Sequence, residues 1–327
     1  MEKKTILVVG GAGYIGSHMV QVLLEKDYRV LILDNFSTGF RQLVVGGDFI
    51  EGSLGDSILL DRIFSGNRID AVMHFAAFSL VGESVRAPLK YYRNNVAETI
   101  ALIEAMVRFD VRRFIFSSTA AVYGEPDAVP IVEDHPCRPT NPYGNGKLAI
   151  ERMLADCDAA HGLKSVCLRY FNAAGAHPSG KIGEMHDPES HLIPLVLKAA
   201  LSSSSIHIFG NDYPTEDGTC VRDYVHVTDL AQAHLLALEA LEDGGGSDTF
   251  NLGNSVGYSV RQVIRIAEKV AGKAIAQVEC ERRAGDPAVL VADSSRIRSV
   301  LGWRPRYEDL ESIVETAWRW HGRQAVK

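Results

Sequence analysis

Short apolar segments recur along the first half of the chain, and longer amphipathic segments separate them. The apolar segments span residues 5–9, 29–33, 71–75, 114–117 and 165–169. Nearly every position in them is apolar, which is typical of parallel strands that helices cover on both faces. Between them, residues 15–25 and 91–109 carry apolar side chains three and four positions apart, as crossover helices do. The alternation predicts an α/β fold with a doubly wound parallel sheet.

The alternation weakens after about residue 175. Residues 177–194 have the composition of a loop, with a helix that begins near Pro194. Residues 225–227 and 229–241 then predict a strand and a helix that return to the first domain. Two domains, each assembled from separated segments, follow from this pattern. We expect the larger domain at residues 1–175 plus about 222–254, and a smaller C-terminal α/β domain at about 176–221 plus 255–327.

Composition limits the classes of function. The chain has 327 residues, of which 46% are apolar and 23% are charged, and both values are ordinary for compact globular proteins. Because the formal net charge is -7, no overall basic surface attracts duplex nucleic acid, and we expect no nucleic-acid partner. The sequence has no run of about 18 apolar residues, so we expect no membrane partner either.

Cysteines and histidines give no sign of a metal site. The five cysteines are widely spaced and form no CxxC pair, which argues against a zinc site and against a disulfide framework. A reducing, cytoplasmic location fits best. His177, His186 and His191 lie in the loop-like segment at spacings that suit no helical or hairpin site, so the sequence predicts no metal.

Three glycines follow the first predicted strand. Gly10, Gly13 and Gly16 form a GxxGxxG pattern at the start of a predicted helix, where backbone N–H groups can approach a pyrophosphate. The second strand ends at Asp34, about 20 residues further on, where a carboxylate accepts hydrogen bonds from ribose hydroxyls and repels a 2′-phosphate. A tight turn and a loop-capping acid are the simpler interpretations. The three signals together favour a Rossmann-type domain that binds NAD rather than NADP.

The start of a later helix carries the candidate proton-transfer groups. Pro142 suits the first turn and Asn141 suits its cap, which places Tyr143 and Lys147 four residues apart on one face. A nearby ammonium, the helix N-terminus and a charged nicotinamide would each favour the phenolate, so Tyr143 is a candidate general base. Thr119 follows a predicted strand at the ligand-binding edge of the sheet and could share the proton. Taken singly, a surface YxxxK pair or a threonine bonded to local backbone is the commoner case.

Seven segments together resemble the extended short-chain dehydrogenase/reductase family. They are GGAGYIGSH (10–18), LDN (33–35), HFAA (74–77), YYRNNV (91–96), FSSTAAVYG (116–124), NPYGNGK (141–147) and LRYFNAAGAH (168–177). Residues 208–231 and 282–287 are similar to the subfamily of 4-epimerases that interconvert UDP-galactose and UDP-glucose. The resemblance covers the chain from about residue 5 to about residue 305.

The resemblance implies an NAD-dependent isomerase. In such an enzyme, hydride leaves carbon 4 of the UDP-sugar for tightly bound NAD and returns to the opposite face of a 4-keto intermediate. The resemblance makes Tyr143 the base, Lys147 the modulator of its pKa and a ribose contact, and Thr119 the hydroxyl that shares the proton. It also implies a homodimer that pairs helices near residues 88–109 and 144–160.

Binding residues are implied in both domains: the expected NAD contacts lie in the larger domain, and the expected UDP-sugar contacts are divided between the two. The expected NAD contacts are Gly10, Gly13, Tyr14, Ile15, Gly16, Asp34, Asn35, Ser53, Leu54, Phe75, Ala76, Ala77, Ser79, Asn95, Thr119, Tyr143, Lys147 and Tyr170. The expected substrate contacts are Thr119, Tyr143, Asn172, His191, Leu192, Phe209, Arg222, Arg283 and Asp286. Two arginines suit a diphosphate and an aromatic ring suits the uracil.

Three positions depart from the family's usual pattern. Ser53 stands where an aspartate usually contacts the adenine amino group. Ser79 stands where some members have a lysine near the pyrophosphate. Gly146 replaces a small hydroxyl residue and slightly weakens its helix turn. The first two departures bear on the adenine contact and on charge neutralisation at the pyrophosphate.

Other functions stay open at this point. A sugar-nucleotide dehydratase or decarboxylase would carry acidic residues just after Thr119, where this chain has Ala120 and Ala121. A 4-epimerase of UDP-N-acetylhexosamine, of UDP-xylose or UDP-arabinose, or of UDP-glucuronate is the main alternative. Leu290, at the expected N-acetyl position, is bulky and favours plain hexoses. A non-catalytic NAD(H)-binding regulator is opposed by the complete set of three proton-transfer side chains.

Overall fold

The structure, a computed structural model, describes residues 3–283 and 285–325. The chain divides into two compact units, each assembled from separated segments. Unit 1 contains the described residues up to Gly124, Cys137–Arg169 and Ala231–Phe250, and unit 2 contains Glu125–Pro136, Tyr170–Leu230 and the described residues from Asn251 onward. The domain boundaries expected from the sequence differ from these units mainly at residues 125–136 and 222–230, which lie in unit 2.

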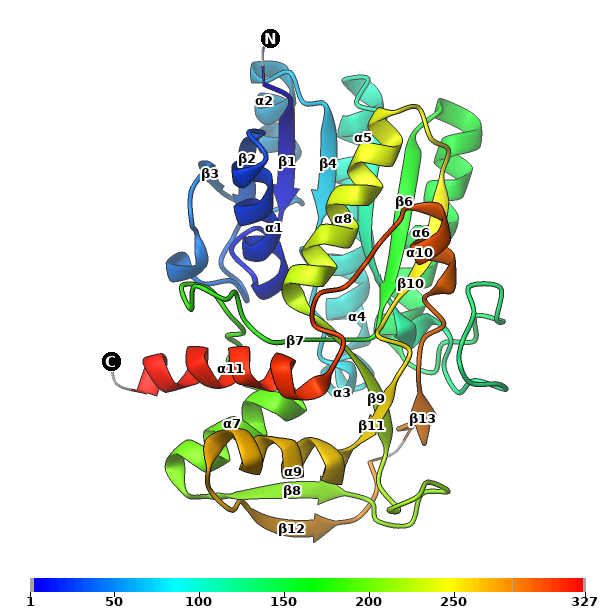
Figure 1. Ribbon diagram of the computed structural model, residues 1–327. Coiled ribbons are helices and arrows are strands. Elements are labelled where there is room, and N and C mark those ends of the chain that lie inside the picture. Colours follow the sequence, from blue (N-terminus) through cyan, green and yellow to red (C-terminus); the bar gives the residue numbers. More distant parts are fainter. Residues whose placement is uncertain (1–2, 284, 326–327) are drawn as a thin grey trace. The chain divides into compact units, whose positions relative to one another are not determined.

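A seven-stranded sheet forms the centre of unit 1 (Figure 1). Its strands are β1 (Thr5–Val9), β2 (Arg29–Asp34), β3 (Asp48–Glu51), β4 (Ala71–His74), β5 (Arg113–Thr119), β6 (Lys164–Tyr170) and β10 (Asp248–Leu252). Their order is β3-β2-β1-β4-β5-β6-β10. β1 pairs in parallel with both β2 and β4. The predicted doubly wound α/β fold is confirmed.

The strand order reverses at β1, because the chain continues to β2 on one side and later to β4 on the other. The carboxyl ends of these strands are level, since Val9 is in register with both Leu33 and His74. Loops that leave such a reversal point diverge and expose backbone groups, which is the usual location of a dinucleotide in this kind of sheet. The loops after β1, β2 and β4 are therefore the expected location of a dinucleotide in this fold.

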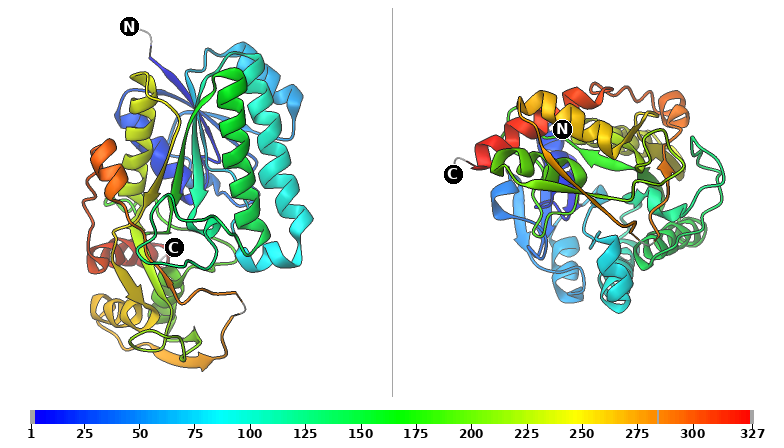
Figure 2. Two further views of the ribbon diagram at one scale, coloured as in Figure 1. Left: turned by 90° about the vertical axis from the view of Figure 1, so that its right-hand side faces the viewer. Right: turned by 90° about the horizontal axis from the view of Figure 1, so that it is seen from below.

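Helices cover both faces of this sheet. They are α1 (Tyr14–Glu25), α2 (Ser57–Gly66), α3 (Val81–Arg86), α4 (Pro88–Tyr91), the π-helical segment η2 (Tyr92–Ala97), α5 (Glu98–Arg108), α6 (Pro142–His161) and α8 (Val227–Glu242). Figure 2 shows α5 and α6 on one face of the sheet and α8 on the other. The single helix expected at residues 91–109 is divided, because η2 has wider turns than the α-helices around it. None of the described helices is long and apolar enough to cross a membrane.

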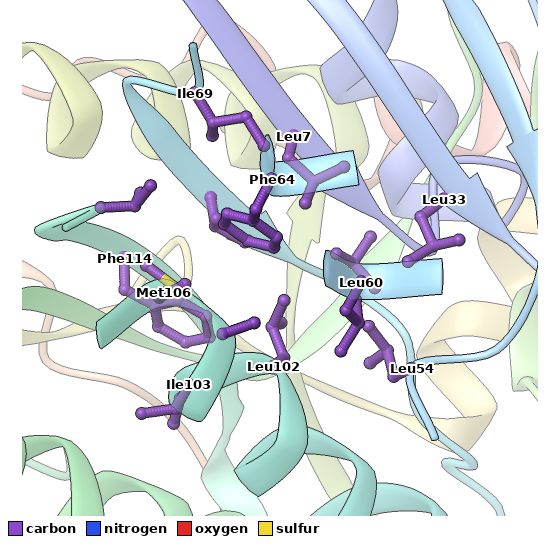
Figure 3. Close-up of a cluster of buried hydrophobic side chains, with 14 of the residues drawn as sticks. Leu7, Leu33, Leu54, Leu60, Phe64, Ile69, Leu102, Ile103, Met106 and Phe114 are labelled. Carbon is purple, nitrogen blue, oxygen red and sulfur yellow. The ribbon is translucent and has the colours of Figure 1, made fainter. Parts of the chain in front are cut away.

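One face of the sheet packs against α2 and α5 through large apolar side chains (Figure 3). Leu7 and Phe114 from the strands and Leu60 and Leu102 from the helices are fully buried in the same cluster. Burying a side chain of this size contributes about 1.5–3 kcal/mol relative to leaving it exposed. The cluster therefore supplies much of the stability of unit 1 and holds the strand ends on a rigid support.

Unit 2 contains two small sheets and the helices that pack on them. Its elements are β7 (Asn172–Ala174), α7 (Leu192–Ser202), β8 (Ser205–Phe209), β9 (Val221–His226), β11 (Gly257–Ser259), α9 (Val260–Ala271), β12 (Ala276–Cys280), β13 (Val289–Leu290), α10 (Ser295–Val300) and α11 (Leu310–Ala325). β9 pairs with β7, β11 and β13, while β8 pairs in parallel with β12. Figure 1 shows α9 lying over β8 and β12. α7 begins at Leu192, close to the start that the sequence predicts.

The helices α7, α9 and α11 share one apolar core. Val196 of α7, Ile264 of α9 and Val314 of α11 are fully buried in it. The start of α9 is fixed by a capping box, in which the Ser259 hydroxyl accepts from the Gln262 N–H and the Gln262 side chain accepts from the Ser259 N–H. Reciprocal capping satisfies two backbone donors that the first turn would otherwise leave unpaired. Unit 2 thus has a core of its own.

Asp223 joins three backbone segments of unit 2. Its buried carboxylate accepts hydrogen bonds from the backbone N–H groups of Asn254 (2.8 Å), Ser255 (3.0 Å) and Ala292 (3.1 Å). Buried backbone donors need acceptors, and a carboxylate can serve several of them at once. Because Asp223 follows Arg222 in β9, this contact also fixes the backbone beside an expected substrate residue.

Asp223→Asn tests how much this contact contributes. The amide has one acceptor oxygen, and its NH₂ group faces backbone donors, so we expect the free energy of unfolding to fall by about 2–4 kcal/mol. Urea unfolding followed by tryptophan fluorescence measures the loss. Asp134→Asn, at an exposed position of the same unit, is the control and should change the value by less than about 0.5 kcal/mol. Equal effects of the two substitutions would show that Asp223 is not a structural acceptor.

Candidate active site

The turn between β1 and α1 requires glycine at two positions for different reasons. Gly10 has a φ of +82°, and a Cβ there would lie 2.5 Å from the backbone nitrogen of Ala76. A Cβ at Gly16 would collide with the carbonyl oxygen of Gly10. The backbone after β1 and the backbone after β4 therefore pack directly together. Gly13, at the N-cap of α1, offers no side-chain acceptor, so this helix N-terminus suits an anionic ligand.

Asp34, at the end of β2, is buried and bonded to this turn. One carboxylate oxygen accepts from the Ala12 N–H at 2.9 Å, and the other accepts from the Phe36 N–H at 2.8 Å. Burial raises the pKa of Asp34, and these two hydrogen bonds lower it. Each oxygen has a further lone pair that a ribose hydroxyl can use, so loop bracing and ribose binding are compatible. The next residue, Asn35, accepts from the Ser37 N–H at 2.9 Å and shapes the same loop.

The loop after β4 is held by the buried Asn95 of η2. The Asn95 amide donates to the Phe78 carbonyl and accepts from the Phe78 N–H, both at 2.9 Å. The N–H groups of Phe75 and Ala76 both donate to the Val9 carbonyl, at 2.8 and 3.1 Å. The structure therefore places the start of this loop beside the glycine turn. The other two expected cofactor residues of the loop are Ala77, which is half-buried, and Ser79, which is exposed.

Ser53 lies after β3 and is bonded to a carboxylate from another element. Its hydroxyl donates to Oε2 of Glu98, the first residue of α5, at 2.7 Å. A Cβ on Gly55 would lie 3.4 Å from the carboxyl carbon of Glu98, so the acid reaches the loop itself. A carboxylate from α5 thus lies beside position 53, where the family resemblance leads one to expect an aspartate. Leu54 beside it is buried in the core.

The predicted start of α6 is confirmed. The helix begins at Pro142, and the Asn141 side chain accepts from the Gly144 N–H at 2.9 Å. Tyr143 and Lys147 share a face of the helix, and the Lys147 ammonium lies 6.0 Å from the centre of the Tyr143 ring. This ammonium donates to the carbonyl of Ser117 in β5 at 2.7 Å. The start of α6 is thereby tied to the carboxyl end of β5.

The Thr119 side chain forms hydrogen bonds with Tyr143 and with the backbone of a neighbouring residue. Its hydroxyl oxygen accepts from the Ala121 N–H at 3.1 Å, and a side-chain hydrogen bond joins it to Tyr143. Since the hydroxyl oxygen already accepts, its proton can be donated to the tyrosine oxygen. The local backbone contact and the contact expected for catalysis therefore occur together.

Burial opposes charge on both members of the tyrosine–lysine pair. It raises the pKa of Tyr143, while the Thr119 hydrogen bond lowers it. It lowers the pKa of Lys147 to about 7, although the nearby Glu151 and Cys167 act in the opposite direction. Tyr143 is therefore neutral at pH 7 when no ligand is bound. The phenolate expected from the sequence requires a further positive charge.

A buried ion pair supports the start of α6. Arg169 of β6 donates to Glu151 of α6, with a shortest distance of 2.6 Å, and to the hydroxyl of Tyr123 at 3.0 Å. Ser118 of β5 also donates to Glu151. Because Glu151 lies one turn beyond Lys147, this network links β5, β6 and α6. The sequence pattern did not indicate it, since charged helix residues usually face solvent.

Unit 2 brings four of the expected substrate residues together in two pairs. The Arg222 Nη2 atom lies 3.9 Å from an oxygen of Asp286. The Arg283 guanidinium lies 3.9 Å from the centre of the Phe209 ring. Forked cations suit a diphosphate, and an aromatic ring suits a flat base. The chemistry of these pairs therefore agrees with a nucleotide ligand.

Two other expected residues lie on strands that pair with β9, and a third is the last residue of β6. Asn172 of β7 donates to the Asp223 carbonyl at 2.9 Å. Leu290 of β13 is in register with Arg222 of β9, so the residue at the expected N-acetyl position is a direct strand neighbour of an expected substrate residue. Tyr170, the last residue of β6, is half-buried. The strands of unit 2 thus position residues that are far apart in the sequence.

His191 and Leu192 lie at the start of α7, and His191 bonds the carboxylate of Glu184. Glu184, His186, Glu189 and His191 form a cluster whose potential ligand atoms all lie within 4.8 Å of one another. Despite burial, the two histidines lower the pKa of Glu184 to about 2. Despite burial, the two glutamates raise the pKa of His186 to about 9. The histidine spacing considered from the sequence did not reveal this cluster, because the loop fold supplies the two glutamates.

The glycine turn, Asp34 and the Thr119–Tyr143–Lys147 group lie in one Rossmann-type unit. Such a set defines a nicotinamide-dependent enzyme that moves a proton together with a hydride. The chain belongs to the NAD dependent epimerase/dehydratase family, whose model matches residues 6–253. The predictions of an NAD-dependent enzyme and of NAD as its cofactor are confirmed.

Relatives with a named activity cover almost the whole chain. The UDP-glucose 4-epimerase of Halalkalibacterium halodurans is 55% identical, over 97% of this chain and 95% of the relative. The crystal structure of UDP-glucose 4-epimerase from Brucella ovis in complex with NAD is 46% identical, with a TM-score of 0.94 over 96% of this chain and 97% of that one. The structure from Bifidobacterium longum in complex with NAD⁺ and UDP is 38% identical, with a TM-score of 0.94 over 98% and 99% of the two chains. The resemblance that the sequence indicates is confirmed.

Proposed function

We propose that the chain is a UDP-glucose 4-epimerase, which interconverts UDP-galactose and UDP-glucose through a 4-keto sugar. The observation that carries this proposal is the bonded group of Thr119, Tyr143 and Lys147 at the carboxyl end of β5, in the same unit as the dinucleotide turn. The named activity of the relatives supports the choice of sugar. Alanines at positions 120 and 121 support simple epimerisation over dehydration.

The groups at the carboxyl ends of β1 and β2 fit NAD. The glycine turn and the N-terminus of α1 hold its pyrophosphate, and Asp34 accepts from its ribose. When bound, NAD would supply reversible hydride transfer at carbon 4 of the sugar and, in its oxidised form, a positive charge at the site. Tyr143 needs such a charge, because burial by itself raises the pKa of this side chain.

Tyr143 takes the proton of the 4-hydroxyl group and gives it back when the ketone is reduced. Thr119 donates to the tyrosine oxygen and stabilises the phenolate. Lys147 adds a cation, and its carbonyl partner Ser117 fixes the position of that cation. A side chain that loses one proton and regains it in each cycle is suited to both directions of the reaction.

Unit 2 anchors the nucleotide in this proposal. Arg222 and Arg283 neutralise the diphosphate, while Phe209 packs against the base. A firm hold on the UDP moiety leaves the 4-keto sugar able to turn and present its other face. Leu290, the strand neighbour of Arg222, narrows the sugar pocket and favours plain hexoses.

Glu98 supplies the carboxylate for the adenine amino group. Its Oε2 accepts from Ser53 at 2.7 Å, so the acid lies at the end of β3, beside the loop that carries Asp34 on the neighbouring strand. The departure at position 53 is therefore compensated from α5.

The chain is a homodimer in this proposal, and its location is the cytoplasm. α3, α4 and η2 expose four large apolar side chains, namely Val81, Val85, Leu89 and Tyr92. These elements pack against α6, the second helix of the expected dimer face. A second copy of the same surface buries such a patch on both partners. None of the five cysteines, all of which the structure describes, forms a disulfide, which agrees with a reducing compartment.

An assay without added cofactor tests the function. Purified protein is incubated with UDP-galactose, UDP-N-acetylgalactosamine or UDP-xylose, and the products are identified by NMR. We expect UDP-galactose to be converted fastest, because the enzyme carries its own NAD and regenerates it in every cycle. If only UDP-N-acetylgalactosamine or only UDP-xylose is converted, that UDP-sugar would replace UDP-galactose as the proposed substrate. If the protein contains NAD but converts none of the three sugars, the result would support a non-catalytic NAD(H)-binding regulator instead.

Tyr143→Phe in the same assay tests the proton path. Loss of a general base lowers kcat by about 10²–10⁴-fold, while the NAD content should stay unchanged. Tyr92→Phe removes a hydroxyl from an exposed tyrosine and is the matched control. Normal turnover by the Tyr143 variant would exclude this residue as the base.

Glu98→Gln tests the adenine contact. Loss of a charged hydrogen-bond partner costs about 1.5–3 kcal/mol, so we expect NAD to bind about 10–100-fold more weakly, as measured by fluorescence titration of NAD-free protein. Glu104→Gln, at an exposed position of the same helix, should bind NAD normally. The same affinity in both variants would remove Glu98 from the cofactor site.

Light scattering tests the dimer. The protein at micromolar concentration should have twice the mass of one chain, and Leu89→Glu should shift it towards the monomer because a charge then enters the apolar patch. Ile58→Glu, at another exposed apolar position of unit 1, is the control. A monomeric wild-type protein would contradict the proposal.

A further inference from the structure

The loop that precedes α7 gathers four side chains with metal-binding chemistry. The ligand atoms of Glu184, His186, Glu189 and His191 all lie within 4.8 Å of one another. The His186 Nδ1 atom is 3.4 Å from a Glu184 oxygen and 3.6 Å from a Glu189 oxygen, and His191 contacts the same Glu184 oxygen directly. All four residues belong to unit 2, and they come from one segment of eight residues.

The two carboxylates of this cluster are deeply buried. Only 3% of the Glu184 side chain and 4% of the Glu189 side chain are exposed. Buried carboxylates are costly unless cations or hydrogen-bond donors surround them. His191 is the most exposed member, so an ion can reach the cluster from its side.

Two buried polar atoms at the cluster point to a ligand. Glu189 Oε2 has no hydrogen-bond partner among the described residues, although the Lys198 ammonium lies 3.6 Å away. His321 of α11 is also buried, its Nε2 atom has no hydrogen-bond partner in the described part of the chain, and it interacts electrostatically with Glu184 and Glu189. The neighbouring Trp320 donates to the Glu184 carbonyl at 2.9 Å, which fixes α11 against the loop.

We propose that Glu184, His186, Glu189 and His191 bind a divalent transition-metal ion of the Zn²⁺ class. Two imidazole nitrogens and two carboxylate oxygens are a donor set that Zn²⁺ accepts, whereas Mg²⁺ and Ca²⁺ prefer oxygen ligands alone. Tetrahedral zinc with bonds of about 2.0–2.2 Å separates its ligand atoms by about 3.3–3.6 Å. The two His186–glutamate distances already match this separation, so the farthest ligand atoms have to approach by about 1 Å and His191 has to move away from the Glu184 oxygen that it now contacts.

An ion at this position ties the loop to the start of α7. His191 is the residue directly before α7, and His186 and Glu189 are in the loop itself. Glu184 is linked to α11 through Trp320. The ion therefore stabilises the junction of the loop with two helices of unit 2, and it does so whether or not a nucleotide sugar is bound.

The test is a Zn²⁺ titration of the full chain. Protein is freed of metal by dialysis against EDTA, and ZnCl₂ is added in competition with a chromophoric chelator, with MgCl₂ in a parallel titration. We expect one tightly bound Zn²⁺ per chain, a higher melting temperature with Zn²⁺, and no comparable effect of Mg²⁺. His186→Gln should weaken Zn²⁺ binding by at least about 10–100-fold, because the loss of a metal ligand exceeds the effect of losing a supporting residue.

His177→Gln is the matched control. His177 lies in the same segment but is not one of the four residues of the cluster, and its Nδ1 atom forms a hydrogen bond with the Ser179 hydroxyl. Unchanged Zn²⁺ affinity in His186→Gln, or equal losses in both variants, would overturn the proposal, as would the absence of Zn²⁺ binding to the wild-type chain. Glu189→Gln is a second variant in case His186→Gln does not fold, and circular dichroism together with NAD content monitors folding in both.

Discussion

The buried ammonium of Lys147 is the constraint on which the site in unit 1 depends. Only 2% of this residue is exposed, and its charge is held by the Ser117 carbonyl, by the Phe116 ring at 4.7 Å and by Glu151 one turn away. Glu151 in turn needs Arg169, because an unpaired buried charge costs several kcal/mol. The ends of β5 and β6 and the start of α6 are therefore fixed in one arrangement, and Tyr143 takes its position from it.

The same burial makes the site depend on its cofactor. It lowers the pKa of Lys147 to about 7 and raises that of Tyr143, and together with Lys147 it lowers the pKa of His74 to about 3. A site that disfavours charge in this way is inactive by itself, since its base is protonated. A bound cation shifts the balance towards the phenolate, which couples proton transfer to the presence of the oxidised cofactor.

The sequence predicts the features that follow from local rules. Two-sided burial makes the strands continuously apolar, so their positions could be read directly, and the Asn141–Pro142 pair fixed the start of α6. Polar partners that are distant in sequence could not be predicted. Ser53 and Glu98 are 45 residues apart, and no periodicity reports which of many charged residues turns inward. The π-helical turns of η2 were missed for a related reason, because the spacing of apolar residues there is nearly that of an α-helix.

The buried carboxylates of Asp223 and Glu184, both in unit 2, have partners of different kinds. Asp223 faces three backbone N–H groups, whose number and positions the fold fixes, so that this carboxylate has a constant environment. Glu184 faces two imidazoles, which can carry a proton or donate a lone pair. Carboxylates surrounded by backbone donors therefore serve the fold, whereas the imidazoles around Glu184 can release their protons and offer lone pairs to an ion. The carboxylate on the strand that carries Arg222 therefore has a structural role, whereas the carboxylate in the loop that leads into α7 has metal-binding chemistry.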